Sequence, residues 1–210
     1  GVVWLRPVVS HRMNLMRLVD RGISVVLCGR RFPDLPIPAV AEDYGDIARK
    51  TLAWCREQGK EHPALLLGML SGDAEDPYSR DLLTAYRAAA KEAGYEFPKR
   101  CICQAQGVPG AAQLLEHLVH TRPETDAFIC PFSNLLKKLR AMVFAGYWED
   151  PGRIAVVDLM YEYEEDELHD LGGMRLLKVL NPFEAMGKAL CRALECEWTE
   201  APAEEAIDLS

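Results

Sequence analysis

Gly22-Ile-Ser-Val-Val-Leu-Cys-Gly-Arg30 is the stretch that decides the fold of this chain. A glycine suited to ending a helix comes first, an uninterrupted apolar run follows, and a Cys-Gly-Arg turn closes it. Strands of a parallel sheet are buried on both faces, so they show continuous Val, Ile and Leu instead of alternating apolar and polar residues. The stretch therefore predicts one strand of a parallel sheet with a helix on either side.

The same strand pattern recurs along the chain. Predicted strands span Val2–Leu5, Ile23–Cys28, Ala64–Met69, Arg100–Gln104, Ala127–Pro131, Ile154–Leu159 and Arg175–Leu180. Helical patterns lie between them: Ser10 and Asn181 are expected to cap the first and the last, and four are expected to end at Gly22, Gly59, Gly94 and Gly146. Strands that alternate with helices of about 12–15 residues indicate βαβ crossovers, so the predicted fold class is α/β with parallel sheets.

Composition narrows the class of protein. The chain has 210 residues, 49% of them hydrophobic, which suffices for one or two cores. Its net charge of −8 argues against a nucleic-acid surface, because phosphate contacts need clustered Lys and Arg. No run reaches the roughly 20 apolar residues of a membrane span. The seven cysteines are odd in number and lie mostly in apolar contexts, which indicates free thiols in a reducing cytoplasm.

The sequence carries no pattern typical of a catalytic or metal site. It lacks a GxSxG elbow, a phosphate-binding P-loop and an HExxH motif, so no enzyme is predicted. Cys101 and Cys103 share one strand face, and His117 and His120 share one helix face. Neither pair has the further ligands that a zinc site needs, so we expect no metal and no cofactor.

Five further segments resemble, in order and spacing, the motifs of one protein family. They are Gly1-Val-Val-Trp-Leu-Arg-Pro7, Val40-Ala-Glu-Asp-Tyr-Gly45, Ala85-Tyr-Arg-Ala-Ala-Ala-Lys-Glu-Ala-Gly94, Pro151-Gly-Arg-Ile-Ala-Val-Val157, and Leu176-Leu-Lys-Val-Leu-Asn-Pro182 with Met186-Gly187. With residues 22–30, they are similar to the effector-binding domain of LacI/GalR-family transcriptional regulators.

The resemblance implies two Rossmann-like lobes with parallel sheets, a periplasmic-binding-protein-like fold of type I. The first strands of the N-terminal lobe have no counterpart in this chain, which is therefore expected to be N-terminally incomplete. On this basis residues 1–40 form the remainder of the N-terminal lobe and residues 41–160 the C-terminal lobe. Residues 161–210 form a return segment that belongs mostly to the N-terminal lobe.

The resemblance weakens at the residues expected to contact a ligand. The family's arginine, its Ala-Asn-Asp turn and the aspartate after its second strand are replaced by Leu82, Pro131-Phe-Ser133 and Gly29. Its Gly-Phe-Asp-Asp turn becomes Asp158-Leu-Met-Tyr161. Each buried sugar hydroxyl without a polar partner costs on the order of 1–3 kcal/mol, so a common hexose is not the expected ligand.

Parallel sheets bind ligands beyond the carboxyl ends of their strands, which selects six candidate ligand-binding residues. These are Arg80, Gln104, Gln106, Phe132, Asp158 and Asn181. Phe132 offers a stacking surface to a flat ligand, and Arg80 offers a bidentate donor to an anion. Phe132 could equally belong to a core between the lobes, and Asp158 could equally be an exposed acid of a turn. Met13, Met16 and Trp4 are expected in the core or in a subunit interface.

The resemblance implies the ligand-sensing and dimerisation domain of a cytoplasmic transcriptional regulator. A small molecule bound in the cleft between the lobes would change the geometry of a homodimer and reposition a separate helix-turn-helix domain, through which alone the protein contacts DNA. The alternative is an extracytoplasmic solute-binding protein of a transporter, since it shares the two-lobed fold. A third reading is a regulator whose DNA-binding domain follows Ser210, as in some AraC-type proteins with a LacI-like sensor.

Overall fold

Two parallel sheets organise the chain, and helices pack on both of them. The computed structural model describes residues 1–7, 9–69, 77–95, 102–131, 133–159, 171–179 and 183–198. The chain divides into two compact units: unit 1 comprises Gly1–Asp43, Glu75–Asp81 and Pro182–Ser210, and unit 2 comprises Tyr44–Ala74 and Leu82–Asn181. The predicted α/β class with parallel strands is confirmed.

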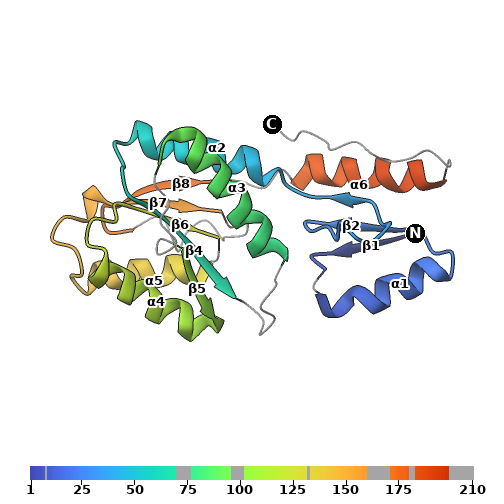
Figure 1. Ribbon diagram of the computed structural model, residues 1–210, viewed down its shortest axis with the longest axis horizontal. Helices are drawn as coiled ribbons and strands as arrows, with labels where there is room; N and C mark the ends of the chain where they lie inside the picture. The colour runs from blue at the N-terminus through green and yellow to red at the C-terminus, as the bar shows by residue number, and fades with distance from the viewer. Residues whose placement is uncertain are drawn as a thin grey trace. The chain divides into compact units, whose positions relative to one another are not determined.

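The sheet of unit 1 has three parallel strands in the order β1-β2-β3. β1 (Val2–Leu5) has its predicted bounds, and β2 (Val25–Cys28) begins two residues later than predicted. β3 (Ala39–Val40) is a two-residue strand that the pattern does not predict. A 3-10 turn (Val9–His11) and α1 (Arg12–Asp20) follow β1, and α6 (Phe183–Trp198) packs on the opposite face of this sheet (Figure 1).

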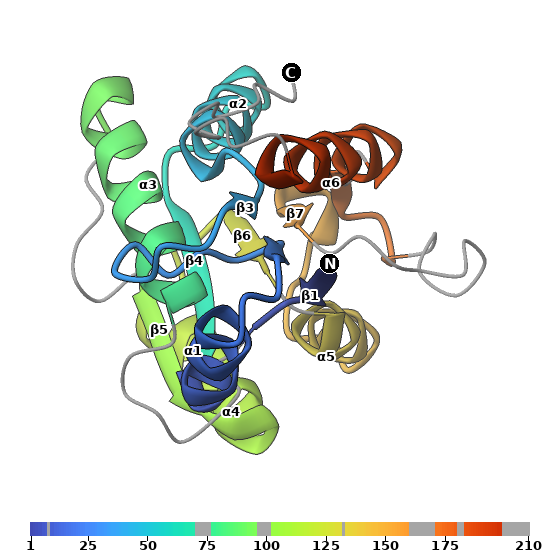
Figure 2. The same ribbon diagram turned by 90° about the vertical axis from the view of Figure 1, so that its right-hand side faces the viewer.

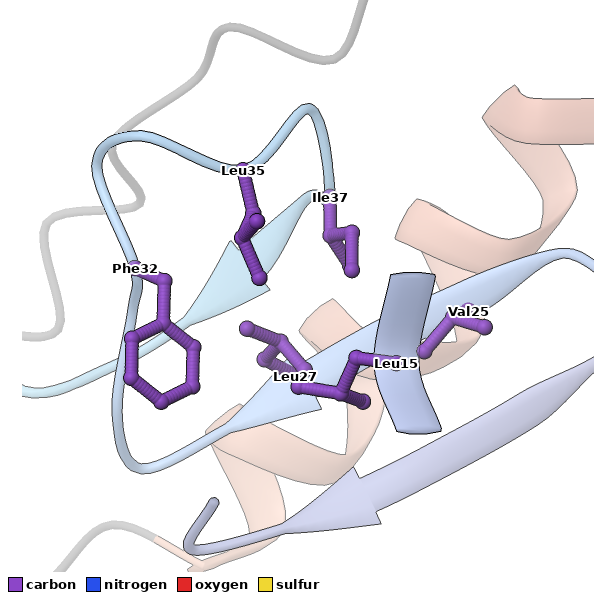
Figure 3. Packing of buried hydrophobic residues seen from close by; sticks show 6 residues of the cluster. All are labelled: Leu15, Val25, Leu27, Phe32, Leu35 and Ile37. Carbon is purple, nitrogen blue, oxygen red and sulfur yellow. The ribbon is translucent and has the colours of Figure 1, made fainter. Parts of the chain in front are cut away.

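The core of unit 1 lies between α1, β2 and the proline-rich loop before β3 (Figure 3). Its buried members are Leu15, Val25, Leu27, Phe32, Leu35 and Ile37. The last three come from the loop, so the loop closes the core with its own apolar side chains. Each such side chain contributes about 1.5–3 kcal/mol through its burial, which holds the loop on the sheet.

Of the two locations expected for Met13, the core and a subunit interface, the structure excludes the core. Leu15 is fully buried, whereas Met13 is 65% exposed and does not belong to the core of this chain. Residues two apart on a helix point in different directions, so packing Leu15 on the sheet turns Met13 outward. Met16 and Trp4 are partly buried against the core, as expected. The residue at the N-cap of α1 is His11 rather than Ser10, and its side chain makes no capping hydrogen bond.

Unit 2 contains a five-stranded parallel sheet in the order β5-β4-β6-β7-β8. The strands are β4 (Pro63–Met69), β5 (Ile102–Gln106), β6 (Ala127–Cys130), β7 (Ala155–Asp158) and β8 (Arg175–Lys178). α2 (Tyr44–Glu57) and most of α3 (Pro77–Ala93) lie on one face, and α4 (Gly107–Thr121) and α5 (Ser133–Phe144) lie on the other (Figures 1 and 2). A 3-10 turn (Pro151–Arg153) leads into β7.

The four predicted glycine helix ends are confirmed, and one local geometry explains them. Gly22, Gly59, Gly94 and Gly146 have φ values of 70°, 68°, 71° and 77°. The next residue then donates its N–H to the carbonyl five positions earlier: Ile23 to Leu18 (3.0 Å), Lys60 to Cys55 (2.9 Å), Tyr95 to Ala90 (2.9 Å) and Tyr147 to Met142 (3.1 Å). This is the Schellman ending, whose left-handed residue favours glycine. None of the helices in the described ranges is both long and apolar enough to cross a membrane.

Candidate functional site

The carboxyl edge of the five-stranded sheet carries a row of three chemically distinct side chains. Cys130, Asp158 and Lys178 are register partners at the ends of β6, β7 and β8. Register partners on neighbouring parallel strands point to the same face of a sheet, so the thiol, carboxyl and amine share one face. Asp158 is only 1% exposed, which contradicts its reading as an exposed acid of a turn. The sequence predicts that Asp158 lies at the end of a strand. Its burial depends on the packing of the neighbouring strands, which the sequence pattern does not show.

The environment of Cys130 favours binding over nucleophilic chemistry at this edge. Burial raises the pKa of the Cys130 thiol well above its usual range, and the nearby Asp158 carboxylate raises that pKa further. The thiolate is the reactive form of cysteine, so this thiol is not a nucleophile near neutral pH. The row therefore offers hydrogen-bonding and charged groups rather than an activated nucleophile.

The remaining predicted site residues lie in several places. Gln106 is the last residue of β5, and Gln104 lies two residues inside that strand because β5 extends to Gln106 instead of ending at Gln104. Two strands separate β5 from β7, so at about 4.8 Å per strand the backbones of Gln106 and Asp158 lie roughly 14 Å apart. Phe132 and Asn181 fall outside the described residues.

Arg80 belongs to unit 1 rather than to the unit that holds Gln106 and Asp158. It lies in the first turn of α3, its side chain is 57% exposed, and its Nε lies 3.7 Å from Oδ1 of Asp81. Thus the structure brings Gln106 and Asp158 to the carboxyl edge of the unit 2 sheet, and Arg80 is described within unit 1.

The carboxyl edge of the three-stranded sheet brings together residues that the sequence reasoning did not select. Arg6 follows β1, Gly29 and Arg30 follow β2, and Arg30 lies over the ring of Tyr78, with 5.4 Å between its guanidinium carbon and the ring centroid. The only sequence signal was the Cys-Gly-Arg turn, which marks Arg30 as a residue at a strand end.

The same edge also contains Cys28 and Glu42. Burial raises the pKa of the Cys28 thiol, the Glu42 carboxylate raises it further, and the Arg6 guanidinium partly opposes them. Glu42 and Arg6 therefore both lie close enough to Cys28 to act on its charge.

Of the residues considered as metal ligands, the two histidines of α4 are described, whereas Cys101 lies outside the described residues. Thr121 Oγ1 donates to the backbone carbonyl of His117 at 2.8 Å, and the ring of His120 lies 5.8 Å from that of Tyr147. Within the described ranges, no group of three or more His, Cys, Asp or Glu side chains is arranged to hold a metal ion.

Comparison with known proteins links this fold to transcriptional regulators. No protein-family model and no curated protein matches the chain. Among solved structures, the transcriptional regulator CelR in complex with cellobiose is 23% identical, with a TM-score of 0.70 over 95% of this chain and 59% of that one. The transcription regulator CcpA of Lactococcus lactis is 17% identical, with a TM-score of 0.73 over 98% of this chain and 72% of that one. A LacI-family regulatory protein from Chloroflexus aggregans is 16% identical, with a TM-score of 0.74 over 96% and 70%.

These similarities confirm the expected periplasmic-binding-protein-like fold class. At 16–23% identity these similarities establish the fold, and they identify neither a ligand nor a partner of this chain. The chain spans 59–72% of the length of these three regulators.

Proposed function

We propose that this chain is the ligand-sensing and dimerisation domain of a LacI/GalR-like transcriptional regulator. The observation that carries the proposal is that three regulator structures match 95–98% of the chain. The match therefore includes both sheets and the helices on them, rather than one common βαβ unit. The proposed protein is cytoplasmic and dimeric, and it contacts DNA through a separate helix-turn-helix domain. Residues 1–40 and most of the return segment 161–210 are proposed to form the N-terminal lobe, and residues 41–160 the C-terminal lobe.

In this proposal the ligand binds at the carboxyl edges of the parallel strands. Asp158 would accept hydrogen bonds from the ligand, because a buried carboxylate at a strand end is a strong acceptor. Arg80, Gln104, Gln106, Phe132 and Asn181 remain the other proposed contacts. Binding regulates DNA only if the ligand has different affinities for the operator-competent and operator-incompetent states.

A catalytic role is not part of the proposal. Two of the buried thiols, Cys55 and Cys130, have raised pKa values, so both hold their protons at neutral pH. The ligand is also not proposed to be a common sugar, although CelR is known in complex with cellobiose. Gly29 and Leu82 stand where the family resemblance places polar groups, and Leu82 is only 1% exposed.

Two measurements test the proposed function. A thermal-shift screen of sugars, nucleobases, aromatic acids and phosphorylated metabolites should find a ligand with saturable binding. A ligand present at 100 times its dissociation constant raises the free energy of unfolding by about 2.7 kcal/mol, which such a screen detects. Asp158→Asn should lower the affinity for that ligand. Asp20 is an exposed acid at the end of α1, so Asp20→Asn should leave the affinity unchanged. The isolated chain should not bind duplex DNA. Tight binding with a steep salt dependence would contradict the division of roles proposed here.

The solute-binding alternative has the same two-lobed fold, so it is separated by function. A regulator fused to its helix-turn-helix domain should change operator affinity when the ligand is added. A transporter component should bind the ligand with no effect on any DNA.

A further inference from the structure

A cavity lies between the neighbouring helices α2 and α3 (Figures 1 and 2), and the proposed sensing function does not use it. Its volume is about 420 Å³, which is within the range of pockets that bind small molecules. All the residues that line it belong to these two helices and to unit 2. They are Arg49, Leu52, Ala53, Arg56, Glu57, Ala89, Glu92 and Ala93.

The floor of this cavity is apolar. Leu52 is fully buried and Ala89 is 4% exposed, so both also belong to the interior of unit 2. Ala53 and Ala93 contribute only a methyl group each, which leaves the space between the two helices open. The cavity can therefore take an apolar body, whose removal from water favours binding.

α2 and α3 run in the same direction along the cavity. The hydroxyl of Tyr86 in α3 donates to Thr51 Oγ1 in α2 at 3.2 Å. Nearer the C-termini of both helices, the guanidinium of Arg56 in α2 donates to the carbonyl of Ala93 in α3. The two helices therefore end side by side. Because the C-terminus of a helix carries a partial negative charge, one end of the cavity receives this charge from both helices.

The charged groups of the lining are separated along the cavity. Glu57 is the last residue of α2 and Glu92 is the last but one of α3, so both carboxylates lie at the end where the helices terminate. Arg49 lies eight residues before Glu57, which is about 12 Å along the helix axis. Arg56 lies at the acidic end, where its guanidinium is 5.2 Å from the centroid of the Tyr95 ring. The cavity is therefore cationic at one end and predominantly anionic at the other.

The cation and the two acids at these ends are available to a ligand. The side chains of Glu57 and Glu92 are exposed, and neither forms a hydrogen bond or ion pair with another described residue. Arg49 Nη2 lies 3.8 Å from Asp46 Oδ1, whereas Lys50 Nζ lies 2.8 Å from Oδ2 of the same carboxylate. Lys50 is thus the closer partner of Asp46, and Arg49 can pair with an added anion.

From these observations we propose that the cavity between α2 and α3 binds a short peptide with free termini and an apolar middle. The carboxylate of the peptide pairs with Arg49, and its ammonium group pairs with Glu57 and Glu92. An extended tripeptide spans about 10 Å, and the long side chains of the lining cover the difference from the helix spacing. The inference does not depend on the sensing function, because none of these residues is a proposed contact of its ligand.

Isothermal titration calorimetry of the full chain with three matched peptides tests the proposal. The probes are alanyl-leucyl-alanine, its N-acetyl form and its C-terminal amide, so each blocked form lacks one of the two charges. The variants are Arg49→Gln and the double variant Glu57→Gln with Glu92→Gln. Arg87→Gln and Glu61→Gln are the controls, because both residues are exposed and neither lines the cavity. Constant ionic strength keeps general screening equal in all measurements.

A further pair of variants tests whether the peptide occupies this cavity. Ala53 is exposed, so Ala53→Trp fills the cavity without changing the core of unit 2. Ala53→Leu is a smaller change that serves if the tryptophan variant does not fold. Circular dichroism checks the fold of each variant, and the folded one should lower the affinity at least tenfold.

The expected result is saturable binding of the free tripeptide, with a dissociation constant at least tenfold below that of either blocked form. Arg49→Gln should raise this constant at least tenfold for the free peptide and less than twofold for the amide, which has no carboxylate to lose. The double variant should likewise affect the free peptide and spare the N-acetyl form. Both controls should change the affinity less than twofold.

Four results overturn the inference. The first is equal affinity for the free and blocked peptides, and the second is an equal loss of the free peptide and the amide in Arg49→Gln. The third is a loss in the controls as large as in the cavity variants, which shows general charge attraction. The fourth is absence of peptide binding, or binding that a folded Ala53 variant leaves unchanged.

Discussion

Replacing Gly172 by alanine tests how the turn before β8 packs on α5. Gly172 has a φ of 63°, and a Cβ built on it would lie 2.5 Å from Cγ1 of Val143 in α5. Its neighbour Gly173 has a φ of 95°, but a Cβ there would have no heavy atom within 4 Å. Gly173→Ala therefore introduces backbone strain alone, and Gly172→Ala introduces backbone strain together with a steric overlap.

The two effects differ in size. A left-handed conformation costs a residue with a side chain about 1–2 kcal/mol, part of which the lower entropy of its unfolded state offsets. Overpacking a buried contact costs about 1–3 kcal/mol, and Val143 is only 9% exposed. We expect Gly172→Ala to lower the free energy of unfolding by about 2–4 kcal/mol and Gly173→Ala by about 1–2 kcal/mol.

Urea unfolding monitored by circular dichroism measures both changes. A double-mutant cycle with Val143→Ala isolates the overlap, because that change removes the methyl group that Ala at 172 would strike. The combined loss in Gly172→Ala with Val143→Ala should be smaller than the sum of the single losses by about 1 kcal/mol or more. Equal losses in the two glycine variants, together with an additive cycle, would refute the packing argument.

Four further predictions concern backbone strain, thiol reactivity, the pH dependence of stability and a buried hydroxyl pair. Arg6→Gly should leave the free energy of unfolding unchanged or raise it by up to about 1 kcal/mol, because relief of the positive φ outweighs the greater entropy of glycine in the unfolded chain. A decrease of more than about 1 kcal/mol would show that Arg6 is not strained. Iodoacetamide should label the exposed Cys191 well before the buried Cys55, as peptide mass spectrometry would report. Burial raises the pKa of Cys55 to about 12, so the folded thiol keeps its proton where the unfolded one loses it; stability should fall as pH rises from 9 to 12, and less steeply in Cys55→Ala. Tyr86→Phe should cost about 1–2 kcal/mol in urea unfolding, because it leaves the buried Thr51 hydroxyl without its bond at 3.2 Å; a cost near zero would contradict this.

The sequence predicts those features of the candidate site that depend only on where a strand ends. Asp158 follows a continuous apolar run, so its position at a strand end could be read from its neighbours in the chain. Its burial and its place beside Cys130 and Lys178 depend on which strands pair, and the sequence pattern does not contain that information. Arg6 is a clearer case, because no local pattern marks a residue that will adopt a φ of 43°.

The sequence by itself determined the α/β class, most strand positions and the four helix ends, because these depend on interactions within a few residues. Continuous Val, Ile and Leu need burial on two faces, and glycine suits the left-handed residue that ends a helix. Only the tertiary structure decided that β3 is a strand, that Leu15 rather than Met13 is buried, and that Arg6 and Arg30 lie near each other. A two-residue strand exists only through its hydrogen bonds to β2, and the buried side of α1 depends on the sheet beneath it. The arginines are 24 positions apart in the chain, and only the parallel register of β1 and β2 joins their strand ends.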